Sequence, residues 1–87
     1  MIDNRVKFRH LQTFVEVARQ SSVLRASEVL HLTPPAVTMQ VKELEGHVGL
    51  KLFERQGRQV TLTTAGEYML VYARKVLATL KDAEDAA

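Results

Sequence analysis

Three histidines and ten carboxylates are the residues of this 87-residue chain that could support catalysis or metal binding. His10, His31 and His47 stand at no metal-ligand spacing with carboxylates, and the chain has no cysteine. Glu43 and Glu45 lie two residues apart on a predicted helix, so they point to different sides and form no acid–base pair. The chain also lacks a glycine-rich phosphate loop and a nucleophile motif. The sequence therefore predicts a protein without enzymatic activity, metal or cofactor.

The charge distribution points instead toward a polyanion. The net charge is +2, but residues 1–80 hold eleven basic and seven acidic groups, whereas residues 81–87 hold one basic and three acidic groups. A mildly basic body with an acidic end is a weak indication of nucleic-acid binding. Taken alone, it is more typical of an ordinary solvated surface, and the 46% hydrophobic content is that of a folded domain.

The most clearly delimited helix is predicted over residues 33–49, TPPAVTMQVKELEGHVG. Thr33 is a suitable N-cap and Gly49 a suitable C-cap, while Pro34 and Pro35 fit a first turn whose N–H groups lack intrahelical partners. Spacings of four, three and four residues place the apolar side chains on one narrow stripe, Val37, Val41, Leu44 and Val48.

The start of this helix has small side chains, so its backbone can approach another surface closely. A helix N-terminus favours anions, but the two prolines remove two N–H donors that would bind a phosphate. Insertion into a groove of nucleic acid therefore fits this helix better. We expect its reading surface to comprise Thr33, Pro34, Pro35, Ala36, Thr38, Met39 and Lys42.

Two shorter helices are predicted before it. Residues 8–20 have the apolar period of an amphipathic helix, with Phe8, Leu11, Phe14, Val15 and Ala18. Residues 22–30 form a second helix, which we expect to turn to the core Val23, Ala26, Val29 and Leu30. Residues 31–33 leave a turn of only about three residues, which is typical of a helix-turn-helix whose second helix reads DNA.

After Gly49 the apolar residues no longer follow a helical period. They alternate with polar residues as in a β-strand, at Leu50, Leu52, Val60 and Leu62. Gln56 and Gly57 lie between the two arms, and glycine adopts the positive φ of a tight hairpin easily. The stretch predicts a two-stranded β-wing. A wing arginine is often only solvated, but beside a reading helix a phosphate or minor-groove contact is the better interpretation. The predicted contact residues are Arg55, Gln56, Gly57 and Arg58.

A long final helix is predicted from a capping box of Thr64 and Glu67, with Thr63 as an alternative start. Its apolar stripe continues beyond the reach of a small domain, so we expect a partner helix. Packing on the chain's own core competes with this interpretation only in the first two turns. The predicted dimer interface is Met69, Tyr72, Val76, Leu77, Leu80 and Ala83.

Together these elements predict a mainly α architecture. Residues 1–63 form a winged helix-turn-helix domain with a three-helix core and a two-stranded β-wing, and residues 64–87 form a linker or dimerisation helix. The first ten residues do not resemble a signal peptide, and no stretch approaches transmembrane length. We therefore expect a cytoplasmic protein with no membrane partner.

From Phe8 onward the chain resembles the N-terminal DNA-binding domain of LysR-type transcriptional regulators. The resemblance is carried by three runs, ASEVLHLTPPAVT, LEGHVGLKLFER and LTTAGE. The part from Tyr68 onward is similar to the linker helix through which two subunits of that family pair. The resemblance implies a bacterial regulator that binds an inverted-repeat promoter site in double-stranded DNA as a dimer, or as a tetramer of dimers. It also implies a separate domain for a small-molecule effector, which this chain does not include.

The chain departs from the family pattern at three positions. Pro34 stands where the family usually has a base-reading Gln, and Met39 where many members have an Arg that can pair with guanine. A Met thioether suits a thymine methyl or a sugar instead. Ser27 replaces the usual Ala. With Pro34 and Met39 the chain resembles one branch of the family, the regulators of carbon-fixation operons. These two residues do not assign the chain to that branch.

Two classes of function remain open. The first is sequence-specific binding of double-stranded DNA, and the second is a winged-helix module that serves only protein–protein interaction. The basic wing beside a small-residue helix start favours the first. A gel-shift assay at two salt concentrations would separate them.

Overall fold

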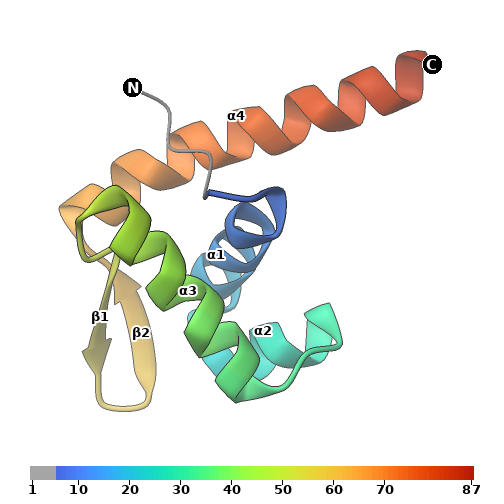
Figure 1. The fold of residues 1–87 in the computed structure, drawn as a ribbon. Helices are drawn as coiled ribbons and strands as arrows, with labels where there is room; N and C mark the ends of the chain where they lie inside the picture. The colour runs from blue at the N-terminus through green and yellow to red at the C-terminus, as the bar shows by residue number, and fades with distance from the viewer. Residues whose placement is uncertain (1–5) are drawn as a thin grey trace.

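The computed structural model describes residues 6–87, and it is mainly helical, as predicted (Figure 1). Three helices, α1 (Phe8–Gln20), α2 (Val23–Leu30) and α3 (Pro34–Val48), precede a hairpin of β1 (Phe53–Gln56) and β2 (Gln59–Leu62). The long helix α4 (Thr64–Ala86) follows and packs on α1. Its C-terminal part extends away from the body.

The core lies where α1, α2 and α3 meet the base of the hairpin. Phe14 and Phe53 pack against each other there, with ring centroids 5.2 Å apart. The predicted apolar periods are confirmed in α1 and α3, except that Phe8 is 43% exposed because it lies in the first turn of α1, at the edge of the body. The core consists of Phe14, Val15, Val17, Ala26, Val37, Val41, Leu44, Leu52, Phe53, Val60 and Ala73.

The predicted ends of the helices are largely confirmed. Thr33 caps α3, its side chain accepting from the N–H of Ala36, and Gly49 ends the helix with φ +76°. Ser22 caps α2 in the same way by accepting from Arg25 N–H. The prediction for Val29 was wrong: it is 52% exposed, since the short α2 turns Ala26 and Ser27 to the core.

The hairpin differs by one residue from the prediction. Gln56 pairs with Gln59, so Gly57 and Arg58 form the turn, not Gln56 and Gly57. Gly57 has φ +63°, which suits the first central position of a type II′ turn. Leu50 and Leu52 lie before β1 and not within it.

Helix α4 begins one residue before the preferred prediction. Thr63, not Thr64, is the N-cap, and its hydroxyl accepts from Gly66 N–H at 3.0 Å and donates to the Lys51 carbonyl at 2.7 Å. The capping box of Thr64 and Glu67 was therefore wrong, and the alternative start at Thr63 was right. Because Gly66 and Ala73 are buried, the first turns of α4 complete the core formed by the three preceding helices and the hairpin.

Candidate nucleic-acid interface

One open groove brings together the start of α2, the outer face of α3 and the wing. Eight of the eleven residues predicted to contact DNA line this groove, namely Pro34, Pro35, Thr38, Met39, Lys42, Arg55, Gly57 and Arg58. The other three are absent from the lining. Thr33 serves as the N-cap of α3, Ala36 is half-buried, and Gln56 pairs with Gln59 at the end of the hairpin.

The start of α3 presents no free backbone donor to this groove. Pro34 and Pro35 have no N–H, Ala36 N–H donates to the Thr33 hydroxyl at 3.3 Å, and Val37 N–H donates to the Thr33 carbonyl at 3.1 Å. The first four residues of the helix therefore have no unpaired backbone N–H group. A helix ordinarily leaves its first N–H groups without a partner. This end of α3 is suited to close contact rather than to binding a phosphate.

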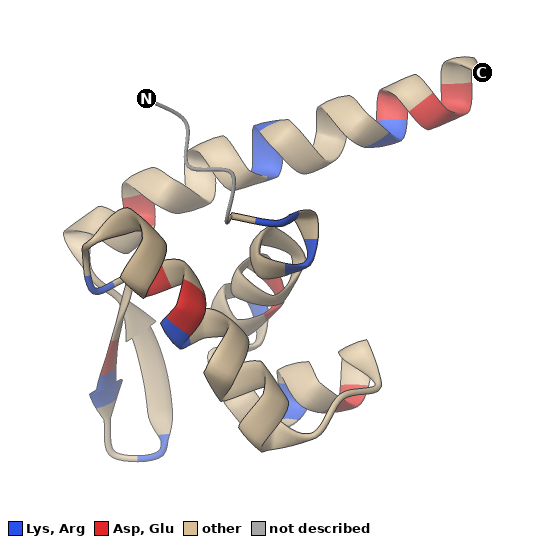
Figure 2. Cartoon of the chain, viewed as in Figure 1, with Lys and Arg blue, Asp and Glu red and all other residues tan. Residues whose placement is uncertain are grey.

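Positive charge surrounds the start of α3 without lying on it. Residues 34–41 contain no charged side chain, and the first turns of the helix are accordingly tan throughout in Figure 2. The groove is instead lined by one cation from α2, one from the middle of α3 and two from the wing, which are Arg25, Lys42, Arg55 and Arg58. Within residues 6–87 these four cations form no ion pair with a carboxylate, so they are available to an external anion.

The sequence interpretation missed Ser22, Leu24, Arg25 and Glu43, which also line the groove. Leu24 is 61% exposed. A signal for the first three was present, because the Ser22 cap fixes the start of α2 and a helix-turn-helix places that start beside the reading helix. A signal for Glu43 was also present, because it follows Met39 by four residues and therefore lies on the same face of α3.

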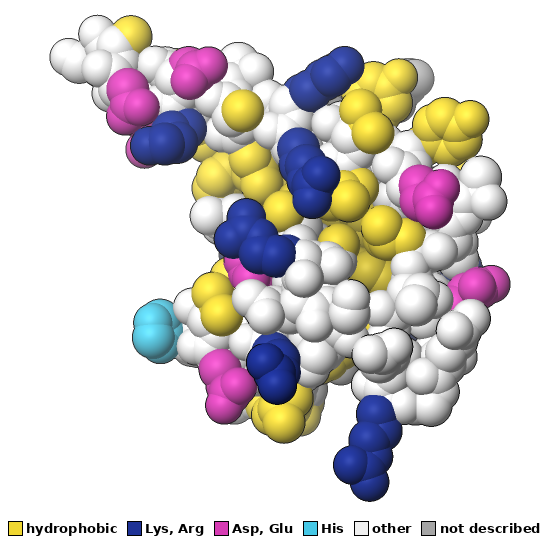
Figure 3. Space-filling view, turned by 180° about the vertical axis from the view of Figure 1, so that it is seen from behind, with side chains coloured by type: hydrophobic (Ala, Val, Ile, Leu, Met, Phe, Trp, Pro, Cys, Tyr) yellow, Lys and Arg dark blue, Asp and Glu magenta, His cyan; other side chains and the backbone are white. Residues whose placement is uncertain are grey.

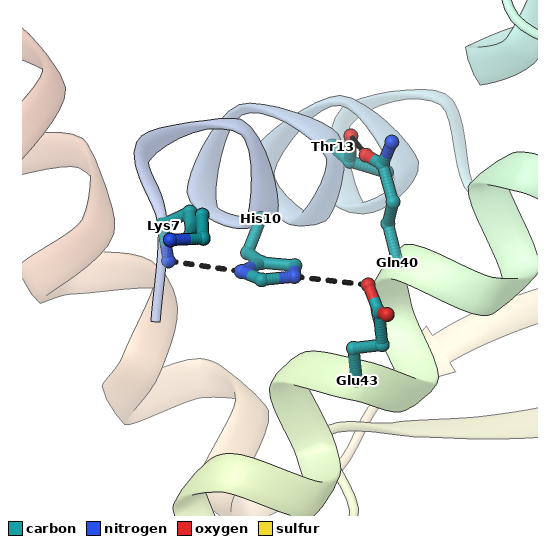
Figure 4. Close-up of polar contacts among 5 residues, drawn as sticks. All are labelled: Lys7, His10, Thr13, Gln40 and Glu43. Carbon is teal, nitrogen blue, oxygen red and sulfur yellow. Dashed lines mark hydrogen bonds and ion pairs between the residues drawn. The ribbon is translucent and has the colours of Figure 1, made fainter. Parts of the chain in front are cut away.

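Two polar pairs join α1 to α3 behind the groove (Figure 4). The ring of His10, only 2% exposed, accepts from Lys7 N–H at Nδ1 and lies 3.1 Å from a Glu43 carboxylate oxygen through Nε2. Because Nδ1 accepts, the proton lies on Nε2, which donates to Glu43. One turn along, the Thr13 hydroxyl donates to Gln40 Oε1 at 2.5 Å. These pairs fix the reading helix against α1.

The wing is attached to the helices at both of its strands. Glu45, near the end of α3, accepts from the backbone at the start of β1, and Val60 N–H in β2 donates to the Ser21 carbonyl at 3.2 Å. The wing cations are therefore held at a defined distance from α3.

The residues predicted to form a dimer interface divide between two sides of α4. Met69 and Leu77 pack partly against the chain's own core, although Leu77 lies beyond the first two turns. Tyr72, Val76 and Leu80 are 61%, 49% and 41% exposed, and Ala83 is also exposed. Figure 3 shows hydrophobic side chains gathered along this helix and beside it. An apolar groove lined by Leu50, Leu52, Ala65, Tyr68, Met69 and Tyr72 adjoins the start of α4.

Within the described residues, no helix is both long and apolar enough to cross a membrane. The same part of the chain contains no group of three or more His, Asp or Glu side chains arranged to hold a metal ion.

Among curated proteins, the chain is 51% identical over 86 residues to the HTH-type transcriptional regulator PcaQ of Agrobacterium fabrum, covering 99% of the chain and 28% of that protein. It is 56% identical over 77 residues to the HTH-type transcriptional regulator CfxR of Cupriavidus necator, covering 88% of the chain and 24% of CfxR. The chain thus spans about a quarter of the length of these relatives.

Solved structures agree with the fold. The DNA-binding domain of CbnR in complex with DNA superposes with a TM-score of 0.88 at 34% identity, covering 93% of each chain. The DNA-binding domain of BenM bound to benA site 1 DNA gives 0.89 at 31% identity, covering 93% of this chain and 94% of that one. Residues 8–67 match the model for the bacterial regulatory helix-turn-helix proteins of the lysR family. The chain belongs to the LysR family of bacterial helix-turn-helix regulators.

Proposed function

We propose that this chain binds double-stranded DNA with the start of α3 in the major groove and the wing against the neighbouring backbone. The observation that carries the proposal is the single groove in which an uncharged helix start is flanked by Arg25, Lys42, Arg55 and Arg58. The major groove of B-DNA, about 12 Å wide, admits an α-helix and has phosphates on both sides. Apolar atoms toward the bases and cations toward the phosphates match that arrangement.

The exposed side of α4 supports pairing with a second copy of the chain. Tyr72, Val76 and Leu80 leave apolar area in water that a twin helix would bury, and a two-fold pair uses the same patch twice. Such a pair presents two reading helices to successive major grooves, which gives an inverted-repeat site. We propose residues 1–63 as the DNA-binding domain and residues 64–87 as the dimerisation helix.

The complete protein is proposed to be a cytoplasmic bacterial transcriptional regulator without enzymatic activity. PcaQ and CfxR, which are both named as transcriptional regulators, support this proposal. This chain spans only about a quarter of the length of these two relatives. For a protein of their length, we propose an additional effector-binding domain and assembly into tetramers.

A gel-shift titration with a random-sequence duplex at about 50 mM and about 200 mM salt tests the proposal. We expect binding that weakens steeply with salt, and a smaller salt slope for Lys42→Ala, whose cation lines the groove. Lys81→Ala, which removes an exposed cation from the far part of α4, is the matched control and should keep the slope. Absence of binding at low salt would favour the alternative, a protein–protein interaction module.

A further inference from the structure

The centre of the reading surface is apolar. Met39 and Leu24 are 57% and 61% exposed, and both line the groove together with Pro34 and Pro35. The backbone at the start of α3 offers no free N–H group, because the prolines have none and the next two N–H groups are already bonded to Thr33. Thr38, half-buried in the same groove, supplies one hydroxyl. Large exposed apolar side chains gathered in one groove indicate a contact that is itself apolar.

The hydrogen-bonding side chains that usually identify purines are not available at this centre. Guanine is read by Arg or Lys and adenine by Asn or Gln. The single amide in residues 34–41, Gln40, is turned toward α1, where its Oε1 accepts from the Thr13 hydroxyl (Figure 4). The nearest cation of α3, Lys42, follows this stretch and lies at its margin.

Only one base of ordinary DNA offers an apolar group in the major groove, and that group is the C5-methyl of thymine. A cytosine methylated at C5 carries the same methyl group at the same ring position. We propose that the surface formed by Leu24, Pro34, Pro35 and Met39 reads C5-methyl groups, so that it favours thymine and accepts 5-methylcytosine in its place while disfavouring cytosine and uracil. This inference rests on the proposed DNA binding.

The test begins with a site selected by the chain from a random duplex pool. The site is then resynthesised with each thymine replaced singly by deoxyuridine, which removes one methyl group and retains every hydrogen-bonding atom. We expect a three- to fivefold loss of affinity at the contacted positions, the value of one buried methyl group, and no change at the flanks. At those same positions a cytosine should bind weakly, and 5-methylcytosine should restore binding.

Protein variants assign the effect to the apolar surface. Met39→Leu should keep the penalty for deoxyuridine, whereas Met39→Ser should bind the thymine and deoxyuridine sites nearly equally. Val29→Ser is the matched control, because Val29 is 52% exposed on α2 and does not line the groove. Circular dichroism and thermal unfolding establish that each variant is folded.

The outcomes separate the two proposals. Salt-dependent binding with no deoxyuridine penalty at any position would overturn methyl reading and leave DNA binding intact. A penalty that Met39→Ser does not reduce would overturn the assignment to this surface. Failure to bind any duplex at low salt would overturn the proposed function itself.

Discussion

The carboxylate of Glu45 joins the end of α3 to the entry of the wing. Its Oε2 atom accepts from Leu52 N–H at 2.8 Å and from Phe53 N–H at 3.3 Å. Both residues are in the core, with exposures of 1% and 9%. Their N–H groups therefore depend on this one side chain, and the same bonds hold β1 at its distance from the reading helix.

Glu45→Ala should leave those two buried N–H groups without a partner. An unsatisfied buried donor costs about 1–3 kcal/mol, so urea unfolding should show a loss of at least that size. Glu45→Gln keeps a carbonyl oxygen as acceptor and should lose clearly less. Equal losses for the two variants would mean that the negative charge, and not the hydrogen bonds, supplies the stabilisation.

Arg58 occupies the second position of the hairpin turn and lines the groove. If it meets a phosphate or enters the minor groove, Arg58→Ala should weaken binding to all duplexes and lower the log–log salt slope by about one unit. The measurement is a gel-shift titration over a salt series, with Lys81→Ala beside it. An unchanged slope and affinity would return Arg58 to a purely solvated role.

The hydrogen bonds of His10 predict which of its two ring nitrogens carries the proton. Because Lys7 N–H donates to Nδ1, nitrogen-15 NMR of the His10 ring should show an unprotonated Nδ1 and a protonated Nε2. Glu43→Gln should retain this tautomer, while Glu43→Ala should lose about 0.5–1.5 kcal/mol of stability, the net value of one hydrogen bond. A protonated Nδ1 in the neutral ring would contradict this arrangement.

Two helical glycines should respond oppositely to alanine. A Cβ at Gly66 would overlap the Leu52 carbonyl oxygen and lie 2.9 Å from Leu62 Cδ2, so backbone would have to move. Overpacking of this kind costs about 1–3 kcal/mol. A Cβ at Gly46 meets nothing within 4 Å, and Gly46→Ala should stabilise α3 by about 0.5–1 kcal/mol. Thermal unfolding of both variants checks the pair, and a stabilised Gly66→Ala would contradict the close contact.

On α4, Leu80 and Leu77 provide a matched test of pairing. Leu80 is 41% exposed, so Leu80→Asp should remain folded but become monomeric and bind an inverted-repeat duplex much more weakly. Leu77 packs against the chain's own core, so Leu77→Asp should instead lower the unfolding temperature. Sedimentation that finds the unmutated chain monomeric at high concentration and on DNA would contradict the proposed dimer.

Features determined by neighbouring residues were the ones that sequence patterns predicted well. The caps Thr33 and Gly49 act within one helix, and both were confirmed. The wing turn lies one residue later than predicted, because Gln56 pairs with Gln59 in the register that the two strands adopt.

Features that depend on distant parts of the chain could not be predicted in this way. Thr63 is the N-cap of α4, and its hydroxyl also donates to the carbonyl of Lys51, twelve residues earlier. The His10–Glu43 pair joins residues 33 positions apart, and no local pattern indicates it. The prediction placed Leu77 in the dimer interface because its spacing could not show that this part of α4 packs against the chain's own core.

The prolines at the start of α3 have a consequence for hydration. Water beside Pro34 and Pro35 finds no backbone donor there, since the following N–H groups of Ala36 and Val37 are already bonded to Thr33. Dehydrating this surface on contact breaks few hydrogen bonds and removes mainly apolar area from solvent. Association through it should therefore lower the heat capacity, the thermodynamic mark of apolar burial, while the surrounding cations contribute through the release of counterions.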